Sequence, residues 1–185
     1  MPASTGAASA LTAILAQLTE DHNRVKKAYR AFVKLAPATD PQAVQAIVKQ
    51  VCKDLRVHAA IEEELLYPAA RSAIEDVELI DEAEVEHEFM HTAIKQLRGM
   101  SPGDDKYAAR FTVLCEYVLH HVKEEEGEIF PQLQQTSLDW ETMAVDIAKR
   151  RTELICADGG DSDEEAGLEF AEDESADPVG NAPTY

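Results

Sequence analysis

The fold is decided by residues 58–68, which read His58-Ala59-Ala60-Ile61-Glu62-Glu63-Glu64-Leu65-Leu66-Tyr67-Pro68, and by a second copy of this pattern. The copy reads His121-Val122-Lys123-Glu124-Glu125-Glu126-Gly127-Glu128-Ile129-Phe130-Pro131. Both have His first, Glu at offsets +4 and +5, and an apolar residue, an aromatic ring and Pro at +8 to +10. Positions i and i+4 share one face of an α-helix, so His58 points with Glu62 and His121 with Glu125. An imidazole beside a carboxylate, found twice in one small chain, indicates a metal site.

Helices are predicted around both stretches from apolar residues that recur every three or four positions. Asp40-Pro41 supplies a cap and a first-turn proline for the second helix, Pro68 should kink or break that helix, and Pro131 should end the fourth. A further short helix is expected beside or across the bundle, from Leu138 to about Cys156. The four main helices are expected from about Ser9 to Leu35, Pro41 to Pro68, Asp76–Leu79 to Gly99, and Asp104 or Asp105 to Pro131.

Length and charge suggest one domain with an acidic extension. Residues 9–157 are assigned to the helical domain, 1–8 to a flexible N-terminus and 158–185 to a disordered acidic tail, which has ten acidic residues and no basic one. The net charge of -19 should repel nucleic acid and anionic membranes, so neither is expected as a partner. No signal peptide is evident, and the three cysteines are far apart, so a cytoplasmic, reduced protein is expected.

Five of the six histidines fall on the inward stripes of the four main helices. Burying Glu62 and Glu125 beside them without a cation would cost several kcal/mol each, and no Lys or Arg lies close by on these stripes. Nitrogen and oxygen ligands without cysteine argue against structural zinc and favour a non-haem iron type of site. Helix bundles build di-iron and di-manganese centres from inward Glu and His on four helices. The five histidines are His22, His58, His87, His91 and His121.

The order His22, His58-x-x-x-Glu62, His87-x-x-x-His91, His121-x-x-x-Glu125 resembles the ligand string of the hemerythrin/HHE cation-binding domain family over about residues 10–135. The resemblance implies a hemerythrin-like, up-down four-helix bundle that holds two Fe ions joined by an oxo or hydroxo group. It also implies that Glu62 and Glu125 bridge the irons. His87, His91 and His121 would bind one iron, and His22 and His58 the other, which keeps an open position. Oxygen-carrying members have Asp five residues after the fourth-helix His; Glu125 at four follows the HHE branch and argues against oxygen transport.

Two classes of function remain open. The preferred one is a di-iron protein that binds or senses O2, NO or reactive oxygen species. The alternative is a redox enzyme acting on peroxide or NO, or an iron donor for the repair of damaged iron–sulfur clusters. No flavin, haem or ferredoxin segment is evident, so a reductant would come from outside. The sequence leaves the oligomeric state open.

The side chains around the predicted ligands have simpler interpretations. His120, rotated by about 100° from His121, should lie at the surface or contact a ligand from outside rather than bind the metal. Tyr67 and Phe130 should plug the bundle end, and Tyr117, one turn before His121, should pack in the core rather than reach the centre. A set of four glutamates should form a solvated face, with hydrogen bonds to the ligand imidazoles as the alternative. This set is Glu63, Glu64, Glu124 and Glu126.

Overall fold

The computed structural model describes residues 5–35 and 40–158, and in these ranges the chain forms helices and no strand. Two of the elements, η1 and η2, are single π-helical turns, and the others are α-helices. In chain order they are α1 (Thr5–Lys34), α2 (Pro41–Ile61), η1 (Glu62–Leu66), α3 (Tyr67–Arg71), α4 (Glu78–Arg98), α5 (Tyr107–Glu124), η2 (Glu125–Ile129), α6 (Phe130–Leu133) and α7 (Trp140–Asp158). The predicted all-α class is confirmed.

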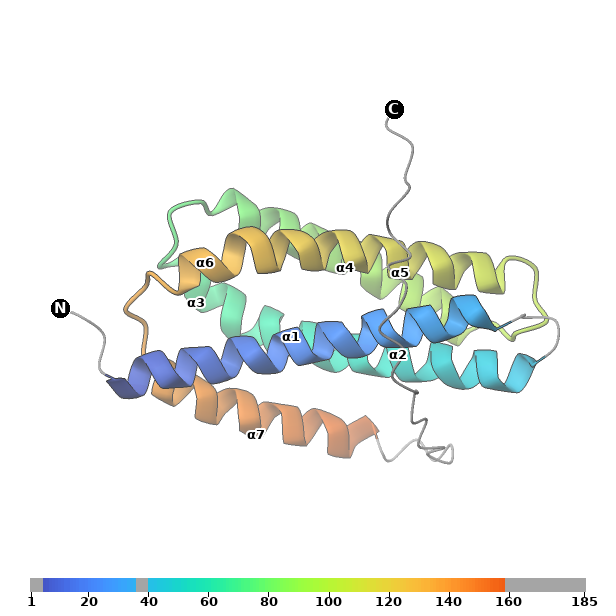
Figure 1. The fold of residues 1–185 in the computed structure, drawn as a ribbon, viewed down its shortest axis with the longest axis horizontal. Coiled ribbons are helices and arrows are strands. Elements are labelled where there is room, and N and C mark those ends of the chain that lie inside the picture. The colour runs from blue at the N-terminus through green and yellow to red at the C-terminus, as the bar shows by residue number, and fades with distance from the viewer. Residues whose placement is uncertain (1–4, 36–39, 159–185) are drawn as a thin grey trace.

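The four long helices form an up-down bundle, as predicted (Figure 1). α1 contacts α2 and α5, and α4 likewise contacts both α2 and α5, so each helix has two neighbours. α7 lies outside this square and runs along α1 and α2. The face formed by α1 and α2 is therefore covered by a fifth helix.

Two helix boundaries differ from the prediction at the ends of the domain. α1 begins at Thr5, four residues before the expected start at Ser9, so residues 5–8 do not belong to the predicted flexible segment. Alanine is the best helix former, and Ala7 and Ala10 pack against the apolar core. At the other end α7 reaches Asp158, and the predicted disordered tail beyond it lies outside the described residues.

The predicted C-terminal helix is present and firmly anchored. α7 has 19 residues, one more than α5, and lies two positions beyond the predicted range of Leu138 to about Cys156. Trp140 and Ile147 are buried against the bundle. Two arginines tie the helix down: Arg150 Nε lies 2.6 Å from Glu64 Oε2, and Arg151 Nη2 lies 2.6 Å from Asp21 Oδ2. Few of its apolar positions are buried, which is why its sequence pattern is weak.

Pro131 does not end the fourth helix, contrary to the prediction, and Pro68, which was expected to kink or break the second helix, lies just after an irregular turn and is followed by further helix. A proline cannot donate to the residue four before it and its ring crowds that carbonyl. Here each proline follows a π-turn, in which the Tyr67 N–H donates to the Glu62 carbonyl and the Phe130 N–H donates to the Glu125 carbonyl. The wider turn accommodates the proline, and helix continues through α3 and α6. Such turns often mark functional sites.

The core consists of two apolar clusters on either side of a polar layer. One cluster contains Val25, Leu55 and Met90, and lies toward the α1–α2 connection. The other contains Leu18 and Ile61, and includes buried residues of α7. The buried polar residues fall between these positions along every main helix. No described helix is long and apolar enough to cross a membrane.

Candidate metal centre

Six of the seven predicted ligands meet in the polar layer, and all six are buried. Two carboxylates, from η1 and η2, are completely inaccessible to solvent. Each of the four main helices contributes one imidazole. The six are His22 from α1, His58 from α2, Glu62 from η1, His87 from α4, His121 from α5 and Glu125 from η2.

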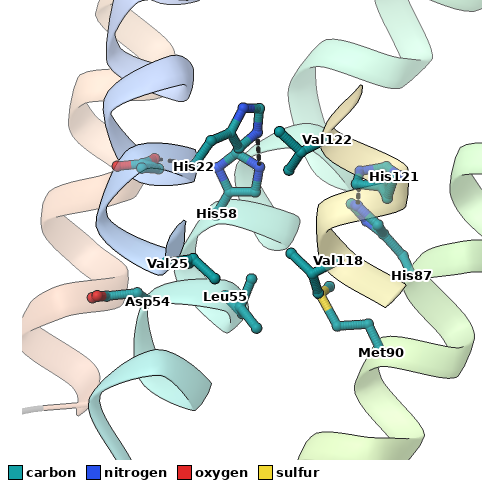
Figure 2. A pocket seen from close by; sticks show the side chains of 11 residues that line it. His22, Val25, Asp54, Leu55, His58, His87, Met90, Val118, His121 and Val122 are labelled. Carbon is teal, nitrogen blue, oxygen red and sulfur yellow. Dashed lines mark hydrogen bonds and ion pairs between the residues drawn. The ribbon is translucent and has the colours of Figure 1, made fainter. Parts of the chain in front are cut away.

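The four imidazoles form two pairs that face each other across the layer (Figure 2). His22 Nε2 lies 3.1 Å from His58 Nε2, and His87 Nε2 lies 3.2 Å from His121 Nε2. Every ring therefore turns the same nitrogen inward. Such convergence of four Nε2 atoms is typical of metal ligands.

Glu62 connects the two histidine pairs. Its Oε1 lies 3.1 Å from His58 Nε2, and its Oε2 lies 3.5 Å from His87 Nε2. Glu125 faces one pair, because its Oε2 lies 3.2 Å from His22 Nε2. Two groups of candidate ligand atoms result, each within 4.8 Å, and they share Glu62. The groups are His22, His58, Glu62 and Glu125, and Glu62, His87 and His121.

A carboxylate lies beside the outer nitrogen of every imidazole. Metal-bound histidines usually have such a partner, which fixes the ring and places the proton on the outer nitrogen. In the neutral form of each ring the inner Nε2 atom then carries the lone pair that a metal ion would need. The distances are 2.8 Å from His22 Nδ1 to Glu126 Oε1, 3.3 Å from His58 Nδ1 to Asp21 Oδ2, 2.9 Å from His87 Nδ1 to Glu63 Oε1, and 2.7 Å from His121 Nδ1 to Glu86 Oε2.

The layer contains buried acceptors that lack a donor. Glu62 Oε1 and Glu125 Oε2 are buried without a hydrogen-bond donor among the described residues, although an imidazole nitrogen lies near each. Burying a carboxylate in this way is costly, and a cation placed between these oxygens and the Nε2 lone pairs would compensate it. The donor set therefore fits a bound metal cation, and it offers two groups of ligand atoms that share Glu62.

The negative potential of the layer also acts on its titratable groups. Burial alone would lower the pKa of His58, but the neighbouring Glu62 and Asp21 carboxylates raise it to about 10. Burial would raise the pKa of Glu125, but the imidazoles of His22 and His121 hold it below its ordinary value. The field that attracts a proton to His58 would attract a metal cation in the same way.

The centre repeats itself along the chain. Asp21, which precedes His22, contacts His58. Glu86, which precedes His87, contacts His121 in the same way. Glu63, which follows Glu62, contacts His87, and Glu126, which follows Glu125, contacts His22. The hydrogen-bonding alternative for Glu63 and Glu126 is thus correct, whereas Glu64 pairs with Arg150 and Glu124 with His120. Asp21 and Glu86 were not predicted, although an acid directly before a predicted ligand in both halves of the sequence was a readable signal.

His91 is the one predicted ligand that the structure does not bring to the cluster. Its side chain is 43% exposed, and its Nε2 lies 2.8 Å from Glu63 Oε1. It stands one turn beyond His87, at the edge of the layer. Glu63 therefore contacts both rings, and the His91 ring lies edge-on to the His87 ring, with centroids 6.4 Å apart.

We expect His91→Ala to keep the full metal content, because no inner ligand atom is removed. His87→Ala, one turn earlier on α4, should lose an ion. Elemental analysis of both purified variants checks the difference. A loss of metal from His91→Ala equal to that from His87→Ala would make His91 a ligand.

One tyrosine reaches the layer, and it is not the one near His121 in sequence. Tyr67 is completely buried, and its hydroxyl lies 3.2 Å from Glu125 Oε1 and 3.5 Å from Glu62 Oε2. Burial and the two carboxylates raise the pKa of Tyr67 well above 10, so its hydroxyl stays protonated and donates. Tyr117 instead pairs with the ring of Phe89, which is 62% exposed, outside the core.

A cavity of about 10 Å³ adjoins the four histidines (Figure 2). Such a volume holds roughly one water-sized molecule. Besides the imidazoles, Asp21 and Asp54, its wall is apolar. The apolar wall consists of Val25, Leu55, Met90, Val118 and Val122.

Comparison with known proteins identifies a matching family, a similar curated protein and a similar solved structure. Residues 13–133 match the family described as the hemerythrin HHE cation-binding domain. A protein of Nostoc sp. named DNA nickase is 34% identical over 117 residues, which are 62% of this chain and 31% of that protein. The crystal structure of a hemerythrin HHE cation-binding domain-containing protein from Mycobacterium kansasii superposes with a TM-score of 0.59 at 22% identity, covering 74% of this chain and 85% of the other. The last similarity concerns the fold.

Proposed function

Because this chain belongs to the hemerythrin HHE cation-binding domain family, we propose that it holds two iron ions in the polar layer and binds O2 or NO beside them. His22, His58 and Glu125 would hold one ion, His87 and His121 the other, and Glu62 would bridge the two. Bound there, the irons would supply a redox pair and an open coordination position. The chain spans about a third of the nickase relative, so that protein's activity on DNA is not carried over.

The observation that carries this proposal is the cavity beside the histidines. Its volume of about 10 Å³ is close to that needed for one water-sized molecule, so it favours a ligand of a few atoms over a large organic substrate. Its five apolar side chains offer an uncharged ligand a site without competition from hydrogen-bonded water. The cavity touches imidazoles of both pairs, so a ligand there would lie next to both metal positions.

The test fills the cavity without touching a proposed ligand. Val118→Ile adds one methylene to the cavity wall, so binding a diatomic molecule would require repacking that costs about 1 to 3 kcal/mol. We expect the NO affinity of the Fe(II)-loaded protein to fall about tenfold, with the iron content unchanged. Visible spectroscopy during anaerobic NO titration measures the affinity. Val113→Ile, at an exposed position of the same helix, is the matched control. Equal NO affinity in both variants would contradict the role of the cavity.

A second function, the reduction of peroxide by an external electron donor, is favoured by Tyr67. Its hydroxyl is a protonated donor held against both carboxylates of the layer. Proton transfer from a positioned side chain is a general contribution to catalysis. The equivalent position in the other half of the chain is Phe130, whose ring stacks over His22 with centroids 6.1 Å apart. A ring without the hydroxyl is therefore tolerated at one of the two positions.

Tyr67→Phe separates the two functions. If the protein consumes peroxide, we expect the rate to fall about 10²-fold, since a positioned proton donor is lost. NO affinity and iron content should stay within about twofold of the wild type, because no cavity wall or metal ligand changes. Rates of peroxide loss with an added reductant, compared with an anaerobic NO titration, provide the measurement. Absence of peroxide turnover in the wild type would leave ligand binding as the function.

A further inference from the structure

A third group of potential metal ligands lies on the outer face of α4 and α5. Glu86, His120 and Glu124 each present one donor atom, and the three atoms lie within 4.8 Å of one another. His120 and Glu124 have the same i, i+4 spacing as both pairs of the buried centre, and His120 Nε2 lies 3.1 Å from Glu124 Oε1. Their side chains are 62% and 38% exposed, so this group is open to solvent.

Glu86 connects the surface group to the buried centre. Its side chain is only 14% exposed, and its Oε2 accepts from His121 Nδ1 at 2.7 Å. The other nitrogen of His121 faces His87 inside the layer (Figure 2). The surface group is therefore in direct contact with one of the proposed inner ligands, His121.

The two halves of the repeated chain differ in how the charge of this carboxylate is compensated. Asp21 is the counterpart of Glu86, and its charge is compensated by Arg24 and by Arg151 of α7. Among the described residues, Glu86 forms an ion pair only with His121. The other potential metal ligands near Glu86 are His120 and a second carboxylate, Glu124. A cation would take the place that the guanidinium of Arg151 has in the other half.

We propose that Glu86, His120 and Glu124 form a second, surface site for a divalent cation, and that metal ions reach the buried centre through it. This inference rests on the proposed di-iron centre. Three protein ligands at an exposed position leave the remaining coordination positions to water. Such a site binds weakly and exchanges quickly, as a delivery site must. Carboxylate and imidazole ligands suit Mn²⁺ and Fe²⁺.

The experiment measures Mn²⁺ binding to protein whose buried centre is already loaded with iron, using the electron paramagnetic resonance signal of free Mn²⁺. We expect about one additional Mn²⁺ per chain. His120→Ala and Glu124→Gln should each weaken this binding about tenfold or more, with the iron content unchanged. Apo forms of both variants should take up Fe²⁺ several times more slowly than the wild type. Glu141→Gln, which removes an exposed charge from α7, should behave as the wild type.

Three results would overturn the proposal: no additional Mn²⁺ on the loaded wild type, undiminished Mn²⁺ binding in His120→Ala, or unchanged Fe²⁺ uptake in both variants. Glu62→Gln separates this proposal from that of the buried centre. That variant should lose buried iron and still bind the surface Mn²⁺. A wild type without buried iron that retains Mn²⁺ at His120 would contradict the di-iron centre alone.

Discussion

Glu62→Gln should abolish the dinuclear centre, whereas Glu125→Gln should retain about one ion per chain. The two carboxylates come from equivalent positions of the repeat, but their oxygens face different partners. Glu62 lies between His58 and His87 and therefore belongs to both ligand groups. Glu125 belongs to one ligand group, its Oε2 lies nearest to His22, and its other oxygen accepts from Tyr67. Glutamine keeps the shape of the side chain and removes the charge that a bridging ligand needs.

Elemental analysis after reconstitution with Fe²⁺ under argon measures the effect. The wild type should contain about two ions per chain, as dinuclear sites in helix bundles do. Glu64→Gln is the matched control, since this exposed residue of the same π-turn pairs with Arg150 and lies outside both ligand groups. Equal metal content in Glu62→Gln and Glu125→Gln would show that the two carboxylates have the same role. Tight binding of zinc without iron by the wild type would contradict the di-iron centre itself.

Removal of the metal should lower the Tm of the wild type by roughly 5–10 °C. The layer lies between two apolar clusters and contains two carboxylates with no solvent access. Without a metal these charges face one another and four imidazoles, and part of their desolvation cost is uncompensated. A metal present at 100 times its Kd adds about 2.7 kcal/mol of stability, and each kcal/mol shifts Tm by about 2–4 °C at this chain length.

Scanning calorimetry of iron-loaded and chelator-treated protein gives the difference in Tm. Hydrogen exchange should rise first in η1 and η2, because these turns hold the two carboxylates. Glu62→Gln should show a much smaller difference between the two treatments. Equal Tm values for loaded and chelator-treated wild type would place the metal at the periphery of the fold.

The His-x-x-x-Glu pairs made much of the fold and the centre predictable from sequence. An i, i+4 pair on an apolar stripe must point inward, and a charged residue there needs a compensating group. Helical spacing was therefore enough to identify His58, Glu62, His121 and Glu125. The helices were predictable from the spacing of their apolar residues and from their capping residues. Asp40, for example, accepts from the Ala43 N–H at 2.9 Å, as its position before Pro41 predicted.

The behaviour of the prolines depended on local geometry that residue type does not specify. Pro68 was expected to kink or break its helix and Pro131 to end its helix, because a proline inside a regular α-helix cannot donate a hydrogen bond and crowds the carbonyl four residues before it. The additional residue of a π-turn removes that conflict, and it begins at Glu62 and at Glu125, the two carboxylates of the centre.

What sequence alone determined about this protein was which residues turn inward, because helical period is a local property of the chain. Only the tertiary structure decided which inward residues meet. His91 has the same spacing from His87 as Glu62 has from His58, yet its ring contacts Glu63 at the edge of the layer. Tyr67 reaches Glu125 from a different helix, although 58 positions separate them along the chain. Contacts between helices depend on how far each helix is rotated and shifted against its neighbours, and no single segment encodes that.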